Sequence, residues 1–361
     1  MKQAFNMSPV LSKYIEQLKV NDNTRTSIDL FDENIGDKEV IIIADALIAN
    51  KTLKSIFLPL SSIGSQGAIA IARSLKFNNT LTLIQLSNNS IGYKGVAAIA
   101  CALEINTALT TLDVGSNNID YRGAIAISNM LKKNNTLVSV CISVNNIGDE
   151  GATAIADAIK HNTILTSIEL LGCNIEEKGT VAIAEALAAN KTLKSICLSH
   201  NQIGSEGIKA IARALKVNNA LTSIQLSQAS IDDEGANALA EALKINTRLT
   251  SINLDKNIIG SEGAAAIADA LKINKTLTSI HLSYNIIDDE GALSIAKALQ
   301  GNKSLKKIDM SSNLIYYFAE CDFKNMLRKN TWLSVEITEE EDYYDPDMLD
   351  FYKNQTSHDT V

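Results

Sequence analysis

The chain has 361 residues, of which 46% are hydrophobic and 20% are charged, and its formal net charge is −8. This balance is typical of a folded globular protein and excludes a disordered chain. Seven acidic residues and no basic residue fall between Thr338 and Asp350, so residues 1–337 carry a net charge of only −1. A body so close to neutral lacks the overall attraction to phosphate of nucleic-acid and anionic-membrane binders, and we expect neither as a partner.

Neither a secretory signal nor a membrane span is apparent. Residues 1–20 hold no apolar stretch of signal-peptide length, and the most apolar segment, residues 40–49, is half a membrane span. The five cysteines are odd in number and lack CxxC spacing, which favours free thiols in a reducing compartment. We therefore expect a cytoplasmic protein without a disulfide framework.

The first predicted element is a short helix over residues 8–18. Its apolar side chains at helical spacing are Val10, Leu11, Tyr14, Ile15 and Leu18. The segment from residue 25 onward repeats itself, as described next, and the first unit of such a repeating array exposes an apolar edge. We therefore expect residues 1–24 to cap that edge.

From residue 25 the chain repeats itself every 28 residues. The first position of each repeat, here called the anchor, is Arg25, then Leu53, Leu81, Leu109, Leu137, Leu165, Leu193, Leu221, Leu249, Leu277, Leu305 and Leu333. In residues 193–220, Ile196 and Leu198 alternate as in a strand, and the apolar residues at 208, 211, 212 and 215 have helical spacing. The sequence predicts eleven strand–helix units with parallel strands over residues 25–332, then a final strand ending at 337.

Two asparagine positions and one glycine position recur within the repeat. The asparagine eight residues after the anchor follows the strand, where its amide can bond backbone groups of its own and the adjacent repeat. At this position stand Asn89, Asn117, Asn145, Asn201, Asn257, Asn285 and Asn313, with Cys173 once. The asparagine twenty-five residues after the anchor follows the helix, and a left-handed conformation is expected there. Glycine fourteen residues after the anchor predicts a close approach of loop and helix.

After Ile337 the sequence leaves the repeat. Residues 338–361 form an acidic tail, yet residues 343–352 also contain tyrosine, phenylalanine, leucine and methionine. This apolar content is too high for a purely solvating segment. We expect residues 343–352 to fold back near Trp332 and Leu333 as a cap, and a free tail that binds a basic partner is the alternative.

The pattern LxxLxLxxN, with a 28-residue period and a helix of the form GAxAIAxAL, resembles the leucine-rich repeats of the ribonuclease-inhibitor type. Such repeats also occur in Ran GTPase-activating proteins and in the sensing domains of NOD-like receptors. The resemblance covers residues 25–337 and implies an α/β solenoid curved as a horseshoe, with a parallel sheet on the concave face and helices on the convex face. It implies much less about function, because one scaffold serves many partners.

Two apolar groups stand at positions where the other repeats are mostly polar. The first comprises Phe57, Pro59, Leu60 and Leu83, and the second comprises Ile258, Tyr284, Ile286 and Leu314. Exposed apolar patches often mark interaction sites, and coverage by a terminal segment is the alternative explanation for each. We predict that both groups bind a partner.

These observations predict a monomeric, non-enzymatic scaffold that binds a protein through its concave face, with no cofactor. No phosphate-binding GxxxxGK[ST] loop is present, and the four histidines fall on different surfaces, which argues against a metal site. A bacterial effector or inhibitor-like binder, delivered into a host cell, is the more specific hypothesis. The alternative is a GTPase activator of the Ran-activator type, although no single arginine or asparagine stands out from the repeat as its functional residue.

Overall fold

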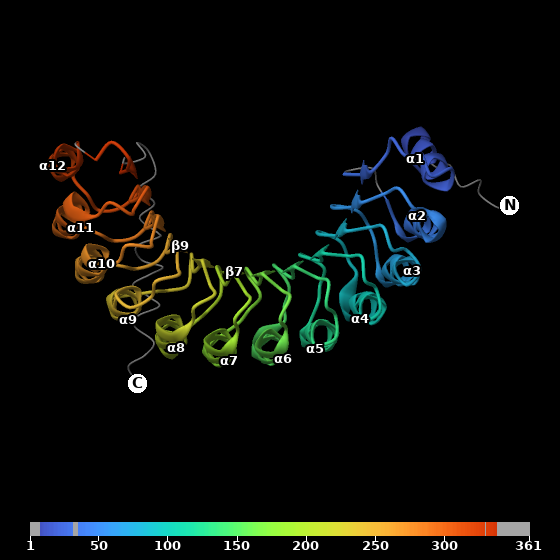
Figure 1. Ribbon diagram of the computed structural model, residues 1–361, viewed down its shortest axis with the longest axis horizontal. Coiled ribbons are helices and arrows are strands. Elements are labelled where there is room, and N and C mark those ends of the chain that lie inside the picture. Colours follow the sequence, from blue (N-terminus) through green and yellow to red (C-terminus); the bar gives the residue numbers. More distant parts are fainter. Residues whose placement is uncertain (1–7, 32–34, 329, 338–361) are drawn as a thin grey trace. The chain divides into compact units, whose positions relative to one another are not determined.

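The computed structural model of the chain describes residues 8–31, 35–328 and 330–337. It consists of two compact units, Met1–Gln225 and Leu226–Val361. In both units a three-residue strand alternates with a helix of 11 to 14 residues (Figure 1). The predicted alternation of strand and helix is therefore confirmed.

The first unit contains eight strands that pair in chain order. Its elements are α1 Pro9–Lys19, β1 Ser27–Asp29, α2 Asp37–Ala49, β2 Ser55–Phe57, α3 Ser65–Leu75, β3 Leu83–Gln85, α4 Gly92–Leu103, β4 Thr111–Asp113, α5 Tyr121–Leu131, β5 Ser139–Cys141, α6 Gly148–His161, β6 Ser167–Glu169, α7 Glu177–Ala189, β7 Ser195–Cys197, α8 Ser205–Val217 and β8 Ser223–Gln225. All pairs are parallel, and each residue faces its equivalent in the next repeat, as Ile28 faces Ile56. Within this unit the strands line the concave side and the helices the convex side (Figure 1).

The second unit continues the pattern with four parallel strands. Its elements are α9 Asp233–Leu243, β9 Ser251–Asn253, α10 Ser261–Ile273, β10 Ser279–His281, α11 Asp289–Gly301, β11 Lys307–Asp309, α12 Tyr317–Leu327 and β12 Ser334–Glu336. The last pair departs from the 28-residue step, because Lys307 faces Ser334. Leu333 is therefore not the anchor of the last strand, which corrects the sequence prediction. The alternation that turns Ile337 inward, where it is buried, sets the register instead.

The core of each unit lies between the strands and the helices. The middle residue of each strand from β1 to β11 is at most 1% exposed, whereas the first and third residues face the opposite side of the sheet. Glycine in the first helical turn lets neighbouring helices approach. A Cβ atom on Gly95 would lie 2.8 Å from the Cβ of Ala68, and one on Gly123 would lie 2.8 Å from Cγ1 of Val96. The predicted close approach at these glycines is confirmed, but the element approached is the neighbouring helix, whereas the sequence predicted a loop.

The asparagine that follows the strand in seven of the repeats ties consecutive repeats together. The Nδ2 group of Asn145 donates to the carbonyl of Val114 (3.1 Å) in the preceding repeat and to that of Ile142 (2.7 Å) in its own. Its Oδ1 atom accepts from the N–H groups of Asn117 (3.0 Å) and Ile119 (2.8 Å). A third carbonyl, that of Ser143, lies 3.2 Å from the same Nδ2. The predicted role of this asparagine is confirmed, because one buried amide bonds five backbone groups of two repeats.

Cys173 takes the place of this asparagine in one repeat and serves part of the same role. Its thiol lies 3.6 Å from the carbonyl oxygen of Ile142, and its backbone N–H donates to Oδ1 of Asn201. Burial raises the pKa of the Cys173 thiol to about 12, so the group stays protonated. Cys173 is therefore a structural residue of the core, as the sequence predicts.

The asparagine that follows each helix forms a second set of bonds between repeats. Asn78 donates to the carbonyls of Leu47 (2.8 Å) and Asn50 (3.1 Å) in the preceding repeat, and its Oδ1 accepts from the N–H of Leu81. The predicted left-handed conformation is wrong, because Asn50 is extended at φ −70° and ψ 134°. Extended backbone lets the chain enter the next strand directly.

Left-handed backbone occurs instead seven residues after the anchor, in the turns that follow β2 to β11. The residues in this conformation at that position are Leu60, Asn88, Ser116, Val144, Gly172, His200, Gln228, Lys256, Tyr284 and Ser312. Non-glycine residues other than asparagine and aspartate adopt it at a cost of roughly 1–2 kcal/mol. The repeat therefore imposes this turn even on residues that disfavour it.

Helix α1 packs against α2 through Leu11, Ile15 and Leu18, all of which are buried. The backbone carbonyl of Leu18 accepts the Nδ2 bond of Asn50 (2.8 Å), as a helix of a full repeat would. Val10 is 45% exposed, so its expected contribution to this contact is wrong. Residues 343–352, for which the sequence predicts a second cap, lie outside the described residues.

We expect Asn145→Ala to lower the free energy of unfolding by about 2–3 kcal/mol, because it leaves several buried backbone groups without a hydrogen bond. Urea denaturation monitored by circular dichroism measures the change. Asn135→Ala is the control, since Asn135 is exposed, and it should change stability by less than about 0.5 kcal/mol. Equal effects of the two substitutions would contradict the bonding role.

We expect Val144→Asn to stabilise the protein by about 1 kcal/mol. Val144 has φ 56° and is 54% exposed, so the substitution relieves backbone strain without removing a packed side chain. Asn88 already occupies the equivalent position two repeats earlier. Thermal unfolding measures the change against Val138→Asn, where a 39% exposed valine has ordinary backbone and no gain is expected. An unchanged or lower melting temperature for Val144→Asn would refute the strain argument.

Candidate binding surfaces

The side of the sheet opposite the helices, here called the sheet face, is built from the first and third residues of every strand. In the first unit most of the first residues are serines, and the Ser55 hydroxyl donates to that of Ser27 (2.8 Å). The third residues vary from strand to strand, from Asp29 and Phe57 to Cys141 and Glu169. The repeat thus holds a constant backbone beneath a variable row of side chains.

The structure brings the first predicted patch together on this face. Phe57 is the third residue of β2 and Leu83 the first residue of β3, so they lie diagonally on adjacent strands, and both are half-buried. Pro59 and Leu60 lie in the turn after β2, where Pro59 is half-buried and Leu60 is 53% exposed. All four residues belong to the first unit and offer apolar atoms to solvent.

A shallow hollow of about 220 Å³ begins at this patch and runs across five strands. Its lining residues are Phe57, Leu83, Ile84, Gln85, Thr111, Leu112, Asp113, Ser139, Cys141 and Glu169. Phe57 and Leu83, on β2 and β3, make one end apolar, while Asp113 lies on the middle strand, β4, and Glu169 lies at the other end, on β6. The hollow therefore combines an apolar end with two carboxylates.

The sheet face of the first unit carries negative charge. Among the first and third residues of β1 to β8, the acids are Asp29, Asp113 and Glu169, and none is Lys or Arg. Burial, followed by the negative charges of Asp113 and Glu169, raises the pKa of the Cys141 thiol to about 12. A thiol with this pKa is protonated near neutral pH, so Cys141 lines the hollow but is not a nucleophile.

Sequence reasoning missed Phe31, which is 58% exposed. Phe31 follows β1 at the repeat position that Pro59 occupies after β2, and its N–H donates to Oδ1 of Asp29 (3.0 Å). The comparison with Pro59 was the available signal, but the first repeat starts with Arg25 in place of leucine. Phe31 extends the apolar surface of the first unit.

The second predicted patch lies in the second unit, on the turns that lead from the strands to the helices. Ile286 is 40% exposed and Leu314 is 44% exposed, whereas Ile258 and Tyr284 are half-buried. Backbone N–H groups of Ile258, Ile286 and Leu314 donate to the preceding repeat, which holds the three side chains in a row. Lys256 lies over the Tyr284 ring, 5.4 Å from its centroid.

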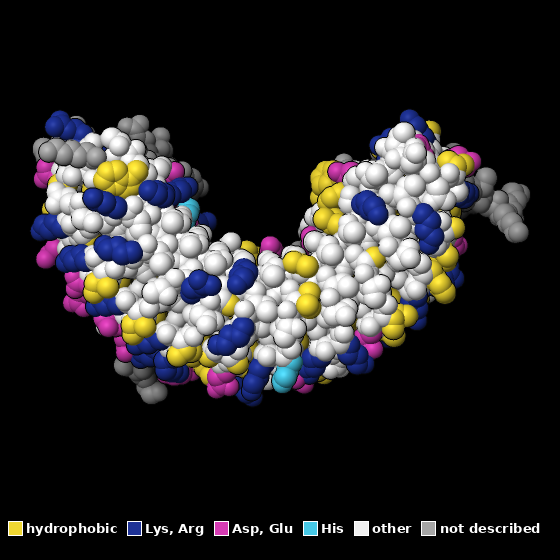
Figure 2. Space-filling view, in the orientation of Figure 1, with side chains coloured by type: hydrophobic (Ala, Val, Ile, Leu, Met, Phe, Trp, Pro, Cys, Tyr) yellow, Lys and Arg dark blue, Asp and Glu magenta, His cyan; other side chains and the backbone are white. Residues whose placement is uncertain are grey.

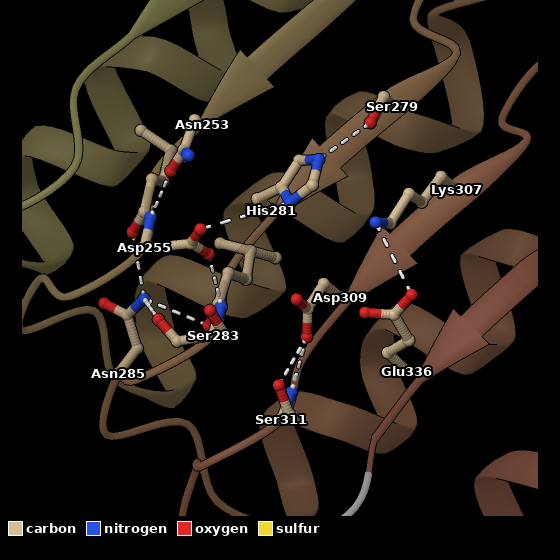
Figure 3. A network of polar contacts seen from close by, with 12 residues as sticks. Asn253, Asp255, Ser279, His281, Ser283, Asn285, Lys307, Asp309, Ser311 and Glu336 are labelled. Carbon is tan, nitrogen blue, oxygen red and sulfur yellow. Dashed lines mark hydrogen bonds and ion pairs between the residues drawn. The ribbon is translucent and has the colours of Figure 1, made fainter. Parts of the chain in front are cut away.

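A polar network covers the sheet face of the second unit (Figure 3). The Ser279 hydroxyl lies 3.1 Å from Nε2 of His281, and Nδ1 of His281 lies 4.0 Å from a carboxylate oxygen of Asp255. The order Ser, His, Asp matches a nucleophilic triad, but 4.0 Å exceeds a hydrogen bond, and the serine is the one that the repeat places on most strands. The network therefore links adjacent strands, and we assign no nucleophile to it.

Among the described residues we find neither a group that could hold a metal ion nor a helix that could span a membrane. No group of three or more His, Cys, Asp or Glu side chains could hold a metal ion there. None of the helices within those ranges has the length and hydrophobicity that crossing a membrane requires.

Comparisons with known proteins agree with this architecture. The family model described as Leucine Rich repeat matches residues 77–100, 106–128, 133–156 and 189–212, and the model described as TMOD/LMOD Leucine-rich domain matches residues 208–286. No curated protein matches the chain.

The chain is similar to several solved structures, and one with a TM-score above 0.5 has the same fold. A chain from the Rad7 and Elc1 complex in yeast has a TM-score of 0.60 and 16% identity, over 90% of this chain and 77% of that one. Leiomodin-1 actin-binding site 2 has a TM-score of 0.37 and 24% identity, over 50% of this chain and 96% of that one. The tropomodulin C-terminal domain of Caenorhabditis elegans has a TM-score of 0.36 and 17% identity, over 41% and 92%. The chain is a leucine-rich repeat protein, and its 28-residue step fits the ribonuclease-inhibitor type.

Proposed function

We propose that this protein is a non-enzymatic scaffold that binds another protein through the sheet face of its first unit. The observation that carries the proposal is the hollow, whose apolar end is formed by Phe57 and Leu83 and whose remaining lining includes the carboxylates of Asp113 and Glu169. Packing of the core does not require apolar side chains at these outward positions, because other strands have serine or polar residues there.

The size and charge of the hollow indicate what it receives. Pockets for drug-sized ligands measure about 300–1,000 Å³, and this hollow is smaller and open to solvent. It fits one protruding apolar side chain of a partner, and its carboxylates favour Lys or Arg beside that side chain. The scaffold is already ordered, so binding on this side costs little conformational entropy.

Leucine-rich repeat domains generally mediate protein–protein interactions, and the similar structure from yeast is that of a complex between two proteins. Both facts support a protein partner. We place the main apolar contact with the partner in the first patch rather than the second, because the first patch adjoins the hollow and its carboxylates.

We further propose where the protein acts, in what oligomeric state, and how its segments are organised. The chain acts as a cytoplasmic monomer, and an effector or inhibitor-like role would suit a rigid binder without a catalytic group. Residues 1–24, which include α1, cap the repeat domain, residues 25–337. The predicted acidic tail that partly caps its other end, residues 338–361, lies outside the described residues. Light scattering of the purified chain tests the monomeric state.

We expect Phe57→Asp to weaken binding of the partner by more than about 1 kcal/mol, or roughly fivefold in Kd. The purified chain captures the partner, and titration of that partner against wild type and variant gives the two dissociation constants. The melting temperature should stay nearly unchanged, because Phe57 faces away from the core.

Ile69→Asp is the matched control, since Ile69 lies on α3 of the same repeat and is 41% exposed on the helical side. Equal weakening by both variants, or a large loss of stability in Phe57→Asp, would refute the proposed site. Stimulation of a small GTPase by about ten-fold or more in a hydrolysis assay would replace the proposal with the GTPase-activator alternative.

A further inference from the structure

The segments that lead from each helix to the next strand form one edge of each unit, here called the helix-end edge. In the first unit these segments are residues 48–54, 76–82, 104–110, 132–138, 160–166, 188–194 and 216–222. They hold nine lysines, all exposed, and one acid, Glu104. In the second unit the corresponding segments are residues 244–250, 272–278, 300–306 and 328–334, whose described residues hold seven basic residues and no acid.

Apolar side chains accompany the lysines along this edge. The residue just before the buried asparagine that follows the helix is exposed and apolar in several repeats: Phe77 (62%), Ile105 (64%), Val217 (61%), Ile245 (58%) and Ile273 (56%). Figure 2 looks onto this edge and shows Lys, Arg and hydrophobic side chains over it, with few acidic side chains away from the outer rim. Each unit therefore has an edge that is both basic and apolar.

Helix dipoles explain only part of this arrangement. Basic residues near the last helical turn, such as Lys216 and Lys272, are stabilised by the negative end of the helix dipole. Lys54, Lys194 and Lys306 lie beyond the helices, next to the strands, where this stabilisation has faded. Exposed isoleucines gain nothing from a dipole. A ligand that attracts both lysine and apolar side chains accounts for the lysines beyond the helices and for the exposed isoleucines.

The acids of the protein cancel only part of the charge of this edge. Ion pairs join Lys132 to Asp157, Lys133 to Glu104, Lys244 to Glu241 and Lys272 to Asp269. The edge still holds more basic than acidic residues, because many of the acids lie in the first turns of the helices, as Asp149 and Glu150 do in α6. A helix of 14 residues separates its two ends by about 21 Å, and charges are screened over about 8 Å at physiological salt. The near-neutral net charge, from which we expected no membrane contact, therefore averages over two edges of opposite sign.

We propose that the helix-end edge binds an anionic lipid surface. Lysines can lay their alkyl chains along a bilayer and place their ammonium groups at lipid phosphates, while isoleucines between them enter the interface. Equivalent residues of successive repeats lie side by side along one edge of each unit, so they can contact a flat surface together. Nucleic-acid binders use arginine and stacked aromatic residues more heavily than this edge, where all nine basic residues of the first unit are lysines.

Vesicle co-sedimentation of the full chain tests the proposal. Vesicles of phosphatidylcholine with about 30% phosphatidylserine should bind the protein, vesicles of phosphatidylcholine alone should not, and binding should fall as salt rises. The edge variant reverses three exposed lysines of the second unit, Lys275→Glu, Lys303→Glu and Lys306→Glu. Because each lysine near an anionic surface strengthens binding about fivefold, this variant should bind at least about 100-fold more weakly.

The control variant makes the same change in net charge away from the edge, with Lys38→Glu, Lys94→Glu and Lys178→Glu at exposed positions in the first turns of α2, α4 and α7. It should retain binding within about threefold. A second edge variant, Ile245→Ser with Ile273→Ser, keeps the charge and should bind about tenfold more weakly, because both side chains are more than half exposed in the free protein. Circular dichroism verifies that every variant is folded.

Three outcomes would overturn the proposal. The full chain fails to bind the anionic vesicles, or the edge variant binds them as well as wild type, or the edge and control variants lose binding equally. Polyglutamate serves as a further probe. If it binds the edge while the vesicles do not, the edge is a site for an acidic protein and the lipid proposal is wrong.

Discussion

The buried asparagine amides are the interaction on which the rest of this structure depends. Seven of the eleven repeats carry one after the strand and all eleven carry one after the helix. Both kinds bond backbone groups of the neighbouring repeat, as Asn145 and Asn78 do. A backbone group left unpaired in the core costs about 1–3 kcal/mol, so a shift of one residue would be penalised at every repeat. This constraint explains why the 28-residue period runs without insertion up to the last strand.

A frame held in this way separates structural positions from variable ones. The middle residue of the strand and the glycine of the helix are committed to packing, and the outward strand residues are not. At these outward positions the sheet face of the first unit carries Phe57 and Leu83 together with Asp113 and Glu169. The helix-end edge, where packing also leaves the residue type open, carries lysines beside exposed isoleucines. The two surfaces differ in charge sign, so they suit different partners.

The sequence was sufficient for the fold and for the first patch. Spacing alone predicts the strands, the helices, the close contact at Gly95 and the outward placement of Phe57. It failed where local and long-range preferences compete. The asparagine after each helix was expected to be left-handed because helices often end so, but its bonds to the preceding repeat hold it extended. The last strand follows the alternation ending at Ile337 rather than the leucine spacing.

Two other features were missed for a different reason. Net charge sums over all positions, so it hid the excess of lysines near one end of the helices and the excess of acids near the other. Phe31 escaped notice because its repeat lacks the leucine anchor, although the position matches Pro59. Both features can be seen when the repeats are aligned. Their significance became clear only when the structure showed which surface each repeat position occupies.

Photo-cross-linking tests most directly the claim that the sheet face of the first unit holds the partner. A benzophenone side chain is introduced at Phe57 in one sample and at Ile69 in another, and each is irradiated with the captured partner. The account predicts a covalent adduct from position 57, where the hollow opens, and none from position 69 on the helical side. An adduct from position 69 without one from position 57 would contradict it.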